Sequence, residues 1–278
     1  MKVLVTGATG NVGRLVVDQL LGTGVQIRAL TNNPTKANLP EGVEVAEGFI
    51  GKPETVKGTL PGIDRLYLAP YPKTAQAVVD LAVEAGVTRI VDLSSSGADD
   101  EANADPASWW FYAVERAVEG APGLEWTHLR PGEFMLNALT WADSIRAEGV
   151  VRAAYGAAAY APLDLQDVAA VAAKALLEDG HHGRKYAMTG PESLSKIEKV
   201  RIIGEVLGRE IRFVEIAHAE ARAEMLALGY GDAADWLLDG DARMIGHPQP
   251  VLSTVPDLLG RPARTLAQWV RDHADAFR

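Results

Sequence analysis

The sequence predicts an α/β protein with a doubly wound parallel sheet, and three observations lead to this fold class. Short apolar runs rich in Val, Ile and Leu alternate with helical patterns through the first two thirds of the chain, as they do when helices cover both faces of a parallel sheet. The first apolar run leads at once into a glycine-rich turn and a helix. No internal repeat or low-complexity linker interrupts the alternation. Together these features predict a Rossmann-type sheet.

The elements follow in order along the chain. Strands are expected at residues 2–6, 25–30, 43–46, 65–69, 89–93, 125–129 and 184–189, where short runs are apolar or β-branched. Helices are expected at residues 12–21, 53–58, 74–85, 107–119 and 164–177, where apolar residues recur at helical spacing. Ser195 and Glu198 have the spacing of a capping box ahead of a helix that Gly208 ends. We therefore expect a dinucleotide-binding domain at residues 1–190.

Residues 191–278 are expected to form a smaller, mostly helical C-terminal subdomain over the cofactor cleft. Large apolar side chains are frequent between residues 217 and 244, and they are expected to supply a substrate pocket. Plain packing is the alternative explanation for most of them. The last helix, with Leu266, Trp269, Val270 and Phe277 on one side, is expected to be structural.

Charge and composition restrict the classes of function. The 278 residues carry a formal charge of −10, so no basic patch favours binding to nucleic acid. The chain has no cysteine and its histidines lack the spacing of metal ligands, so no metal site is expected. No signal peptide opens the sequence, and no apolar run reaches the ~18 residues that span a bilayer. We expect a cytoplasmic monomer or homodimer that acts on a small molecule.

Three glycines follow the first strand at a spacing of three: Gly7, Gly10 and Gly13. Glycine permits a tight turn, a close approach of the backbone to a pyrophosphate and close packing of the helix on the strand. The free N–H groups at the start of the helix favour binding of the phosphates. The residues expected to contact the dinucleotide here are Gly7, Thr9, Gly10, Asn11 and Val12.

The end of the second strand predicts the cofactor. Proteins that bind NAD usually carry an acidic residue there, which holds the ribose hydroxyls. This chain has no acidic residue between positions 18 and 41, and its strand runs into Thr31, Asn32, Asn33 and Lys36. Without the carboxylate a 2′-phosphate is not repelled, and Lys36 would attract it. NADP(H) is therefore expected rather than NAD(H), although Lys36 alone is equally typical of a solvated loop.

Several segments resemble the NmrA-like family of extended and atypical short-chain dehydrogenase/reductases. These are TGATGNVG after the first strand, LEWTHLRPGEFMLN at residues 124–137 and APLDLQDVAAVAAKAL at residues 161–176. The resemblance implies that Pro131, Gly132 and Phe134 lie by the nicotinamide. It also implies that Phe49 and Ile50 flank the adenine, although the family often has an Asp where Phe49 stands and an Arg where Asn32 stands.

Further site residues are expected from the fold, since ligands bind at the carboxyl ends of the strands in such sheets. The fourth strand ends in Ala69 and Pro70, which should border the ribose on the nicotinamide side. The fifth ends in Ser94 and Ser95 at the same edge. A simple turn is the alternative for these serines.

The expected catalytic helix departs from the usual pattern. Short-chain dehydrogenases carry Tyr-x-x-x-Lys there, and four-residue spacing puts both side chains on one face. This chain has ASWWFYAVERAVE instead, in which Tyr112 and Arg116 have the spacing but no lysine follows. The family pattern of an aromatic residue and a Glu aligns Phe111 with Glu115, which places Glu115 inward as a structural or ribose-contacting carboxylate. The two registers face different sides of the helix, and a Tyr112 packed on a helix flank is the plainer alternative.

We therefore expect a reductase that binds NADPH and reduces a carbonyl or quinone on a hydrophobic, aromatic small molecule. Ser95, Tyr112 and Glu115 are the residues expected near the substrate oxygen. Because no dedicated acid is evident, the substrate should be electrophilic enough to accept hydride directly. The rival prediction is a redox sensor that binds NADP(H) without turnover. A nucleotide-sugar epimerase ranks last, because it requires the missing Tyr–Lys pair.

Overall fold

The structure, a computed structural model, describes residues 1–278, and its contacts divide the chain into two compact units. Unit 1 comprises Met1–Pro131, Leu165–Met188 and Asp257–Gly260. Unit 2 comprises Gly132–Asp164, Thr189–Pro256 and Arg261–Arg278. A single boundary near residue 190 was predicted from the sequence, whereas in the structure residues 132–164 belong to the second unit. The chain passes between the units several times, so no single cut in the sequence separates them.

Unit 1 is built on a sheet of seven strands that are all parallel, in the order β3-β2-β1-β4-β5-β6-β9. The strands are β1 (Lys2–Val5), β2 (Gln26–Thr31), β3 (Glu44–Glu47), β4 (Arg65–Leu68), β5 (Arg89–Leu93), β6 (Glu125–Pro131) and β9 (Arg184–Met188). β5 is buried along its whole length, as expected of a strand covered on both faces. The predicted doubly wound fold is confirmed.

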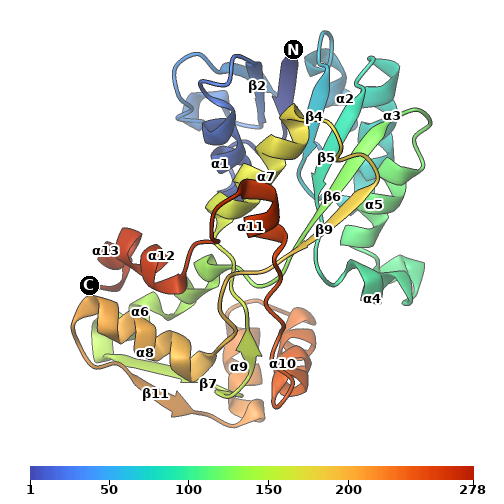
Figure 1. Cartoon of the computed structure of the whole chain (residues 1–278). Coiled ribbons are helices and arrows are strands. Elements are labelled where there is room, and N and C mark those ends of the chain that lie inside the picture. Colours follow the sequence, from blue (N-terminus) through green and yellow to red (C-terminus); the bar gives the residue numbers. More distant parts are fainter. The chain divides into compact units, whose positions relative to one another are not determined.

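Helices cover both faces of this sheet (Figure 1). On one face α7 (Leu165–Leu177) packs along α1 (Asn11–Leu20) and against the central strands. On the other face lie α2 (Pro53–Val56), α3 (Ala75–Glu84) and α5 (Phe111–Glu119), whose apolar residues form one core with the strands. Unit 1 also contains the short helix α4 (Ala98–Ala102) and four 3-10 turns: η1 (Pro34–Lys36), η2 (Lys57–Thr59), η3 (Pro72–Thr74) and η4 (Pro106–Ser108).

The helix expected at 107–119 begins only at Phe111. The preceding 3-10 turn is capped by the Asp105 side chain, which accepts a hydrogen bond from Ala107 N–H at 2.9 Å. Trp109 then adopts an extended conformation, which breaks the helical path. The sequence signal missed this break because both tryptophans fit a helical pattern.

Unit 2 contains small sheets and a group of helices. β7 (Val150–Ala153) pairs with β11 (Arg212–Glu215), and β8 (Ala159–Tyr160) pairs with β10 (Leu194–Ser195). The helical elements are η5 (Met135–Trp141), α6 (Ala142–Glu148), α8 (Lys196–Leu207), α9 (His218–Ala227), α10 (Ala233–Met244), α12 (Leu266–Asp272) and α13 (Ala274–Phe277). α11 (Thr254–Leu259) lies across the boundary of the two units in the sequence.

The main core of unit 2 surrounds Trp269, which is 2% exposed, and it includes Val270 and Phe277, so the structural role predicted for the last helix is confirmed. The capping box of Ser195 and Glu198 and the left-handed Gly208 after α8 are confirmed as well. The apolar-rich stretch between residues 217 and 244 forms two helices, because Gly229 and Gly231 between α9 and α10 both have positive φ. None of the helices is both long and apolar enough to cross a bilayer.

Candidate active site

The glycine turn after β1 forms a cradle in which side chains do not fit. Gly7 has φ +59°, and a Cβ on it would lie 2.9 Å from the Cβ of Ala69. A Cβ on Gly13 would lie 2.2 Å from the carbonyl oxygen of Gly7, and one on Gly10 would lie 3.2 Å from that same oxygen. Gly10 is also the N-cap of α1, whose first turn contains no acidic residue and has no side-chain cap. The N–H groups at this helix start are thus suited to an anion.

Thr6 fixes the cradle to the neighbouring strand. Its Oγ1 donates a hydrogen bond to Tyr67 O at 3.0 Å and accepts one from Ala69 N–H at 2.8 Å. β1 and β4 are also the point at which the strand order of the sheet reverses, because β2 lies on one side of β1 and β4 on the other. In open α/β sheets the ligand crevice forms at this switch point, beyond the carboxyl ends of the strands. The cradle lies there.

The loop after β2 carries polar groups without a carboxylate. Asn33 Oδ1 accepts a hydrogen bond from Lys36 N–H at 3.3 Å and one from Thr35 Oγ1 at 2.9 Å, so Asn33 caps the 3-10 turn. Arg14 donates to Asn38 O at 2.6 Å, which ties the loop to α1. The side chain of Lys36 is exposed and forms no ion pair with the protein. Asn32 is likewise exposed, whereas Thr31 is buried.

Phe49 and Ile50, predicted beside the adenine, face different ways. Phe49 is 36% exposed and packs edge-on against Tyr71, with 5.3 Å between ring centroids. Ile50 lies in the core of unit 1, and its carbonyl accepts a hydrogen bond from Thr74. This burial corrects the expectation for the Ile50 side chain. Ala69 and Pro70 lie partly exposed at the end of β4, beside the cradle.

Ser94 and Glu115 were predicted as cofactor and catalytic residues, but both side chains are enclosed. Ser94 is 1% exposed, and its Oγ donates to Glu115. Glu115 is completely buried and forms a bidentate pair with Arg130, with Nε–Oε1 at 2.8 Å and Nη2–Oε2 at 2.7 Å. The expectation that Glu115 lies at the substrate oxygen is thereby corrected: its inward, structural alternative is the one observed.

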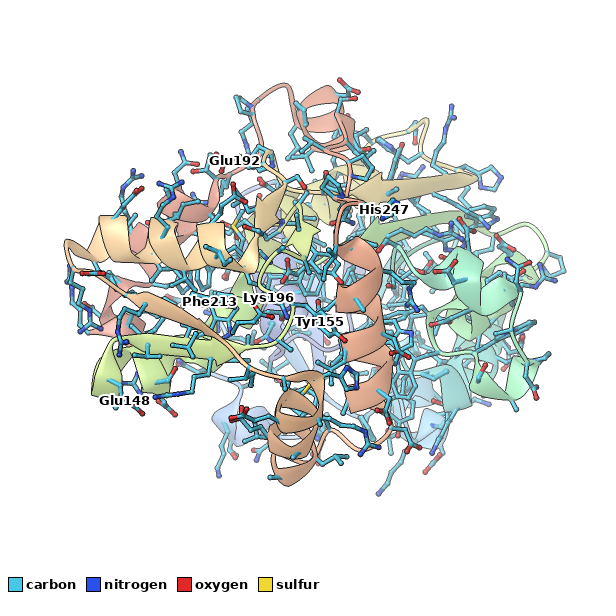
Figure 2. All side chains as sticks on the ribbon, turned by 90° about the horizontal axis from the view of Figure 1, so that it is seen from below. Glu148, Tyr155, Glu192, Lys196, Phe213 and His247 are labelled. Carbon is cyan, nitrogen blue, oxygen red and sulfur yellow. The ribbon has the colours of Figure 1, made fainter.

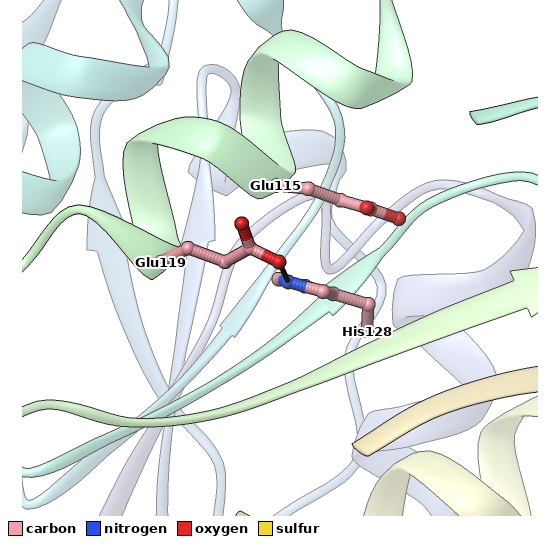
Figure 3. Close-up of side chains that lie close together, drawn as sticks. All are labelled: Glu115, Glu119 and His128. Carbon is pink, nitrogen blue, oxygen red and sulfur yellow. Dashed lines mark ion pairs between the residues drawn. The ribbon is translucent and has the colours of Figure 1, made fainter. Parts of the chain in front are cut away.

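A buried histidine lies next to this pair (Figure 3). His128 is fully buried, and its Nδ1 is 2.6 Å from Oδ1 of Asp92, which confirms the prediction of a hydrogen-bonded interior histidine. Its Nε2 faces Glu119 Oε1 at 3.4 Å. The ligand atoms of Glu115, Glu119 and His128 all lie within 4.8 Å of one another. Lys185 reaches the same cluster, with its Nζ 2.8 Å from Glu119 Oε1.

The charges of this cluster balance one another. Burial alone would raise the pKa of Glu115, but hydrogen bonds from Arg130 and Ser94 outweigh it and hold the pKa below its usual value. Burial would likewise lower the pKa of His128, and the carboxylate of Asp92 overcomes it and raises that pKa. Because the ammonium of Lys185 and the guanidinium of Arg130 neutralise these carboxylates, we assign the cluster a structural role. The expected absence of a metal site stays a prediction.

Tyr112 and Arg116, which have the spacing of a catalytic pair, each have another partner in the structure. The Tyr112 ring packs edge-on against Trp109, with 4.7 Å between centroids, and its hydroxyl makes no hydrogen bond with the protein. The guanidinium of Arg116 instead binds Glu119 Oε2 at 3.1 Å. Ser95 is partly exposed, and its Oγ accepts a hydrogen bond from Gly97 N–H at 3.1 Å.

Unit 2 contains a cavity of about 500 Å³ with mostly apolar walls. Phe134, Met225, Leu228, Leu237 and Leu238 are among its lining residues. Of the three residues predicted beside the nicotinamide, Pro131 ends β6 in unit 1, whereas Gly132 and Phe134 belong to unit 2. A Cβ on Gly132 would lie 2.8 Å from the side chain of Gln249.

Ion pairs line one part of this cavity. Lys196, labelled in Figure 2, donates from its Nζ to Asp241 Oδ2 at 2.5 Å and to Ala154 O at 2.9 Å. Lys199 is paired with Glu133. The sequence analysis missed these residues because the paired side chains come from segments 45 and 66 residues apart. No local motif connects them.

Known NAD(P)H-binding proteins are similar to this chain in sequence. A family model described as NAD(P)H-binding matches residues 7–179, which include the glycine cradle and α5. The chain is 38% identical to the (4-alkanoyl-5-oxo-2,5-dihydrofuran-3-yl)methyl phosphate reductase of Streptomyces griseus subsp. griseus, an alignment that covers 99% of each chain. It is 32% identical to the NAD(P)H azoreductase of Xenophilus azovorans, again over 99% of each chain.

A solved structure is similar over its full length. The NADPH-dependent quinone oxidoreductase of Escherichia coli, complexed with NADPH, superimposes with a TM-score of 0.82 at 27% identity, covering 99% of this chain and 100% of that one. The two named relatives and this neighbour are all reductases or oxidoreductases by name, and the names of the azoreductase and of the E. coli neighbour include NAD(P)H or NADPH.

Proposed function

The chain belongs to the NAD(P)H-binding family of atypical, NmrA-like short-chain reductases, and on this premise we propose that it transfers hydride from NADPH to a quinone or a conjugated carbonyl on a hydrophobic, aromatic small molecule. The glycine cradle at the switch point carries the proposal, because it offers free N–H groups and no negative charge to a pyrophosphate. Gly7, Gly10 and Gly13 bring the backbone close, and Thr6 holds the loop against β4.

The loop after β2 supports the choice of NADPH. Asn32 and Lys36 are exposed there, no carboxylate faces them from the loop, and Lys36 has no ion pair that it must break. A dianionic 2′-phosphate would gain a charge-assisted hydrogen bond from such a lysine. The E. coli neighbour is described as NADPH-dependent, in keeping with this choice.

The kind of hydride acceptor can be inferred from the lysine that α5 lacks. When bound, the cofactor supplies the hydride. No lysine follows Tyr112 on this helix, and Arg116 is engaged by Glu119. A substrate that stabilises the added electron pair by conjugation needs no strong acid, and solvent can supply the proton to the product. The relatives are named for an azo group, a quinone and a 5-oxo-2,5-dihydrofuran, which are conjugated acceptors.

The cavity of unit 2 supports a hydrophobic substrate. Its volume of about 500 Å³ suits a molecule of one or two rings, and aromatic and aliphatic side chains form most of its wall. We propose that Phe134 and Met225 contact the substrate there. Ser95 and Tyr112, which belong to unit 1, remain the residues proposed to contact the substrate oxygen through their hydroxyls.

The experiment is a steady-state assay of NADPH oxidation by the purified protein with 1,4-naphthoquinone, an azo dye and an aromatic ketone, with NADH in parallel. Turnover of the quinone with a higher kcat/KM for NADPH than for NADH supports the proposal. Tight NADP(H) binding without oxidation in the presence of any acceptor would favour the rival function, a sensor that reports its redox state to a partner.

The proposal also includes the location and the assembly state of the protein. We propose a cytoplasmic monomer or homodimer with no nucleic-acid partner, in keeping with the net charge of −10 and the absence of cysteine. Size-exclusion chromatography with light scattering distinguishes the two assembly states.

A further inference from the structure

Large apolar side chains that are exposed to solvent are concentrated in one short stretch of unit 2. Seven of the twelve in the whole chain lie between residues 226 and 251. Leu228 is 76% exposed and Trp236 is 67% exposed. The others are Leu226, Tyr230, Leu237, Ile245 and Val251. Single exposed apolar residues are ordinary, but exposed apolar residues that lie together mark a surface that another molecule covers, and three of these seven line one cavity.

This surface continues into the cavity. Leu228, Tyr230 and Leu237 are exposed and at the same time line the cavity of about 500 Å³. All three come from α9, α10 and the turn between them, which we call the α9–α10 hairpin, residues 218–244. The apolar wall of the cavity therefore extends onto exposed side chains of the hairpin, although Glu224 and Asp241 of the same hairpin also line the cavity.

The hairpin has little interior of its own. The buried cluster beneath it contains only Ala154, Ile216, Ala221 and Leu238, and the ion pair that joins its two helices, Arg222 with Asp235 at 2.6 Å, is itself about half exposed. So small a core leaves its outer apolar side chains uncovered in the chain alone.

The negative charge of the α9–α10 hairpin indicates which kind of molecule can cover its apolar side chains. α9 and α10 carry Glu220, Glu224, Asp235, Asp239 and Asp241 against two arginines. Acidic helices are repelled by anionic lipid headgroups, so this is not the basic, amphipathic surface that binds membranes. An uncharged hydrocarbon chain meets no such repulsion.

We propose that the substrate is an acceptor with an alkyl side chain, whose ring system occupies the cavity and whose chain lies over Leu228, Tyr230 and Leu237. This inference rests on the proposed function, and it adds a substrate class to it. Specificity for chain length is then determined by the α9–α10 hairpin, and the uncovered apolar surface is the part of the binding site that an unsubstituted ring leaves vacant.

The test uses 2-methyl-, 2-propyl- and 2-hexyl-1,4-naphthoquinone with NADPH. Each methylene that leaves water is expected to lower KM by about threefold to fourfold until the hairpin is covered, with kcat nearly constant. In Leu228→Ser the advantage of the hexyl over the methyl compound should shrink at least tenfold; because Leu228 also lines the cavity that holds the ring, the ratio of the two KM values is the readout, rather than either KM alone. Ile197→Ser is the matched control, because Ile197 is 49% exposed on α8 and does not line this cavity.

A binding measurement keeps the inference testable if the protein turns over no quinone. Dissociation constants of the same three quinones for the NADP-loaded protein, measured by quenching of tryptophan fluorescence, should show the same dependence on chain length. Equal affinities for the three compounds, or a dependence that Leu228→Ser leaves unchanged, would refute the inference. So would a wild-type dimer that Leu228→Ser converts to a monomer, since a second copy would then be the molecule that covers this surface.

Discussion

Glu115 on α5 and Arg130 on β6 form a bidentate ion pair in the interior of unit 1, with both nitrogen–oxygen distances below 3 Å. Glu115 is fully buried and Arg130 is 6% exposed. The hydroxyl of Ser94 at the end of β5 binds the same carboxylate, so the pair joins a helix to two strands. The family resemblance aligned Glu115 with a site residue. In the structure Glu115 stabilises the edge of the sheet at which Ser95 lies.

Removing one partner should be costly. In Glu115→Gln the guanidinium of Arg130 keeps its charge but loses its buried carboxylate partner and retains only the exposed carboxylate of Asp99 at 2.9 Å, so unfolding by urea should require about 3–5 kcal/mol less free energy. Glu205→Gln is a suitable control, because Glu205 pairs with Arg201 at the surface, where both side chains are more than half exposed. That variant should unfold like the wild type. Equal midpoints for the two variants would contradict the structural role of Glu115.

The buried His128 predicts a dependence of stability on pH. Asp92, Glu115 and Glu119 face the ring and raise its pKa above the usual value of 6.5, against the opposite effect of burial and of Lys185. A histidine whose pKa is raised by folding contributes stability that is complete below 6.5 and is lost as the pH rises through the folded pKa. The free energy of unfolding should therefore fall as the pH rises above 6.5.

His128→Asn isolates this contribution, because an asparagine amide can still donate to Asp92 but does not titrate. Urea unfolding of the variant between neutral and mildly alkaline pH should show a flatter profile than the wild type. Parallel profiles would mean that His128 is neutral in the folded protein throughout this range.

Features of the fold and of the site could be predicted where the residues that form them are close together in the sequence. The cradle was predictable because Gly7, Gly10 and Gly13 act on one another locally, and the Gly13 position admits no other residue. Glu115 was predicted as an inward residue through the family resemblance, which aligns Phe111 with Glu115. Its partner was not, because the binding of Arg130 depends on how α5 packs on β6.

The division into two units could not be predicted from the sequence, because it also depends on residues that are far apart in the chain. Residues 132–164 follow a sheet strand without a break in composition, but β7 within them pairs with β11, some sixty residues later. Short strands of this kind carry too few residues for an alternating pattern. The ion pairs at the cavity, such as Lys196 with Asp241, likewise exist only after folding.

Lys36 should determine the preference for NADPH. In Lys36→Ala the 2′-phosphate loses its charge-assisted hydrogen bond, so KM for NADPH should rise about tenfold while KM for NADH stays the same. Lys57→Ala is the control, since Lys57 is also an exposed lysine of unit 1 but lies in η2. If both cofactors respond equally to Lys36→Ala, the lysine acts through the loop rather than on the phosphate.

Gly13→Ala should abolish cofactor binding. Its Cβ would lie 2.2 Å from the carbonyl oxygen of Gly7, so the cradle must open or the helix must move away from the strand. Calorimetric titration with NADPH should show no binding at concentrations that saturate the wild type. Gly58→Ala has open space and no positive φ, and it should bind NADPH normally. Normal binding by Gly13→Ala would place the pyrophosphate elsewhere.

Tyr112 gives the last prediction, which separates direct hydride transfer from acid catalysis. A tyrosine acts as a general acid when a neighbouring cation lowers its pKa, but here Arg116 binds Glu119 and the hydroxyl has no protein partner. Tyr112→Phe should therefore change kcat for a quinone by less than about threefold, as should the control Tyr71→Phe, whereas loss of a general acid costs about 10²- to 10⁴-fold. A loss of that size in Tyr112→Phe alone, with KM unchanged, would identify its hydroxyl as the proton donor.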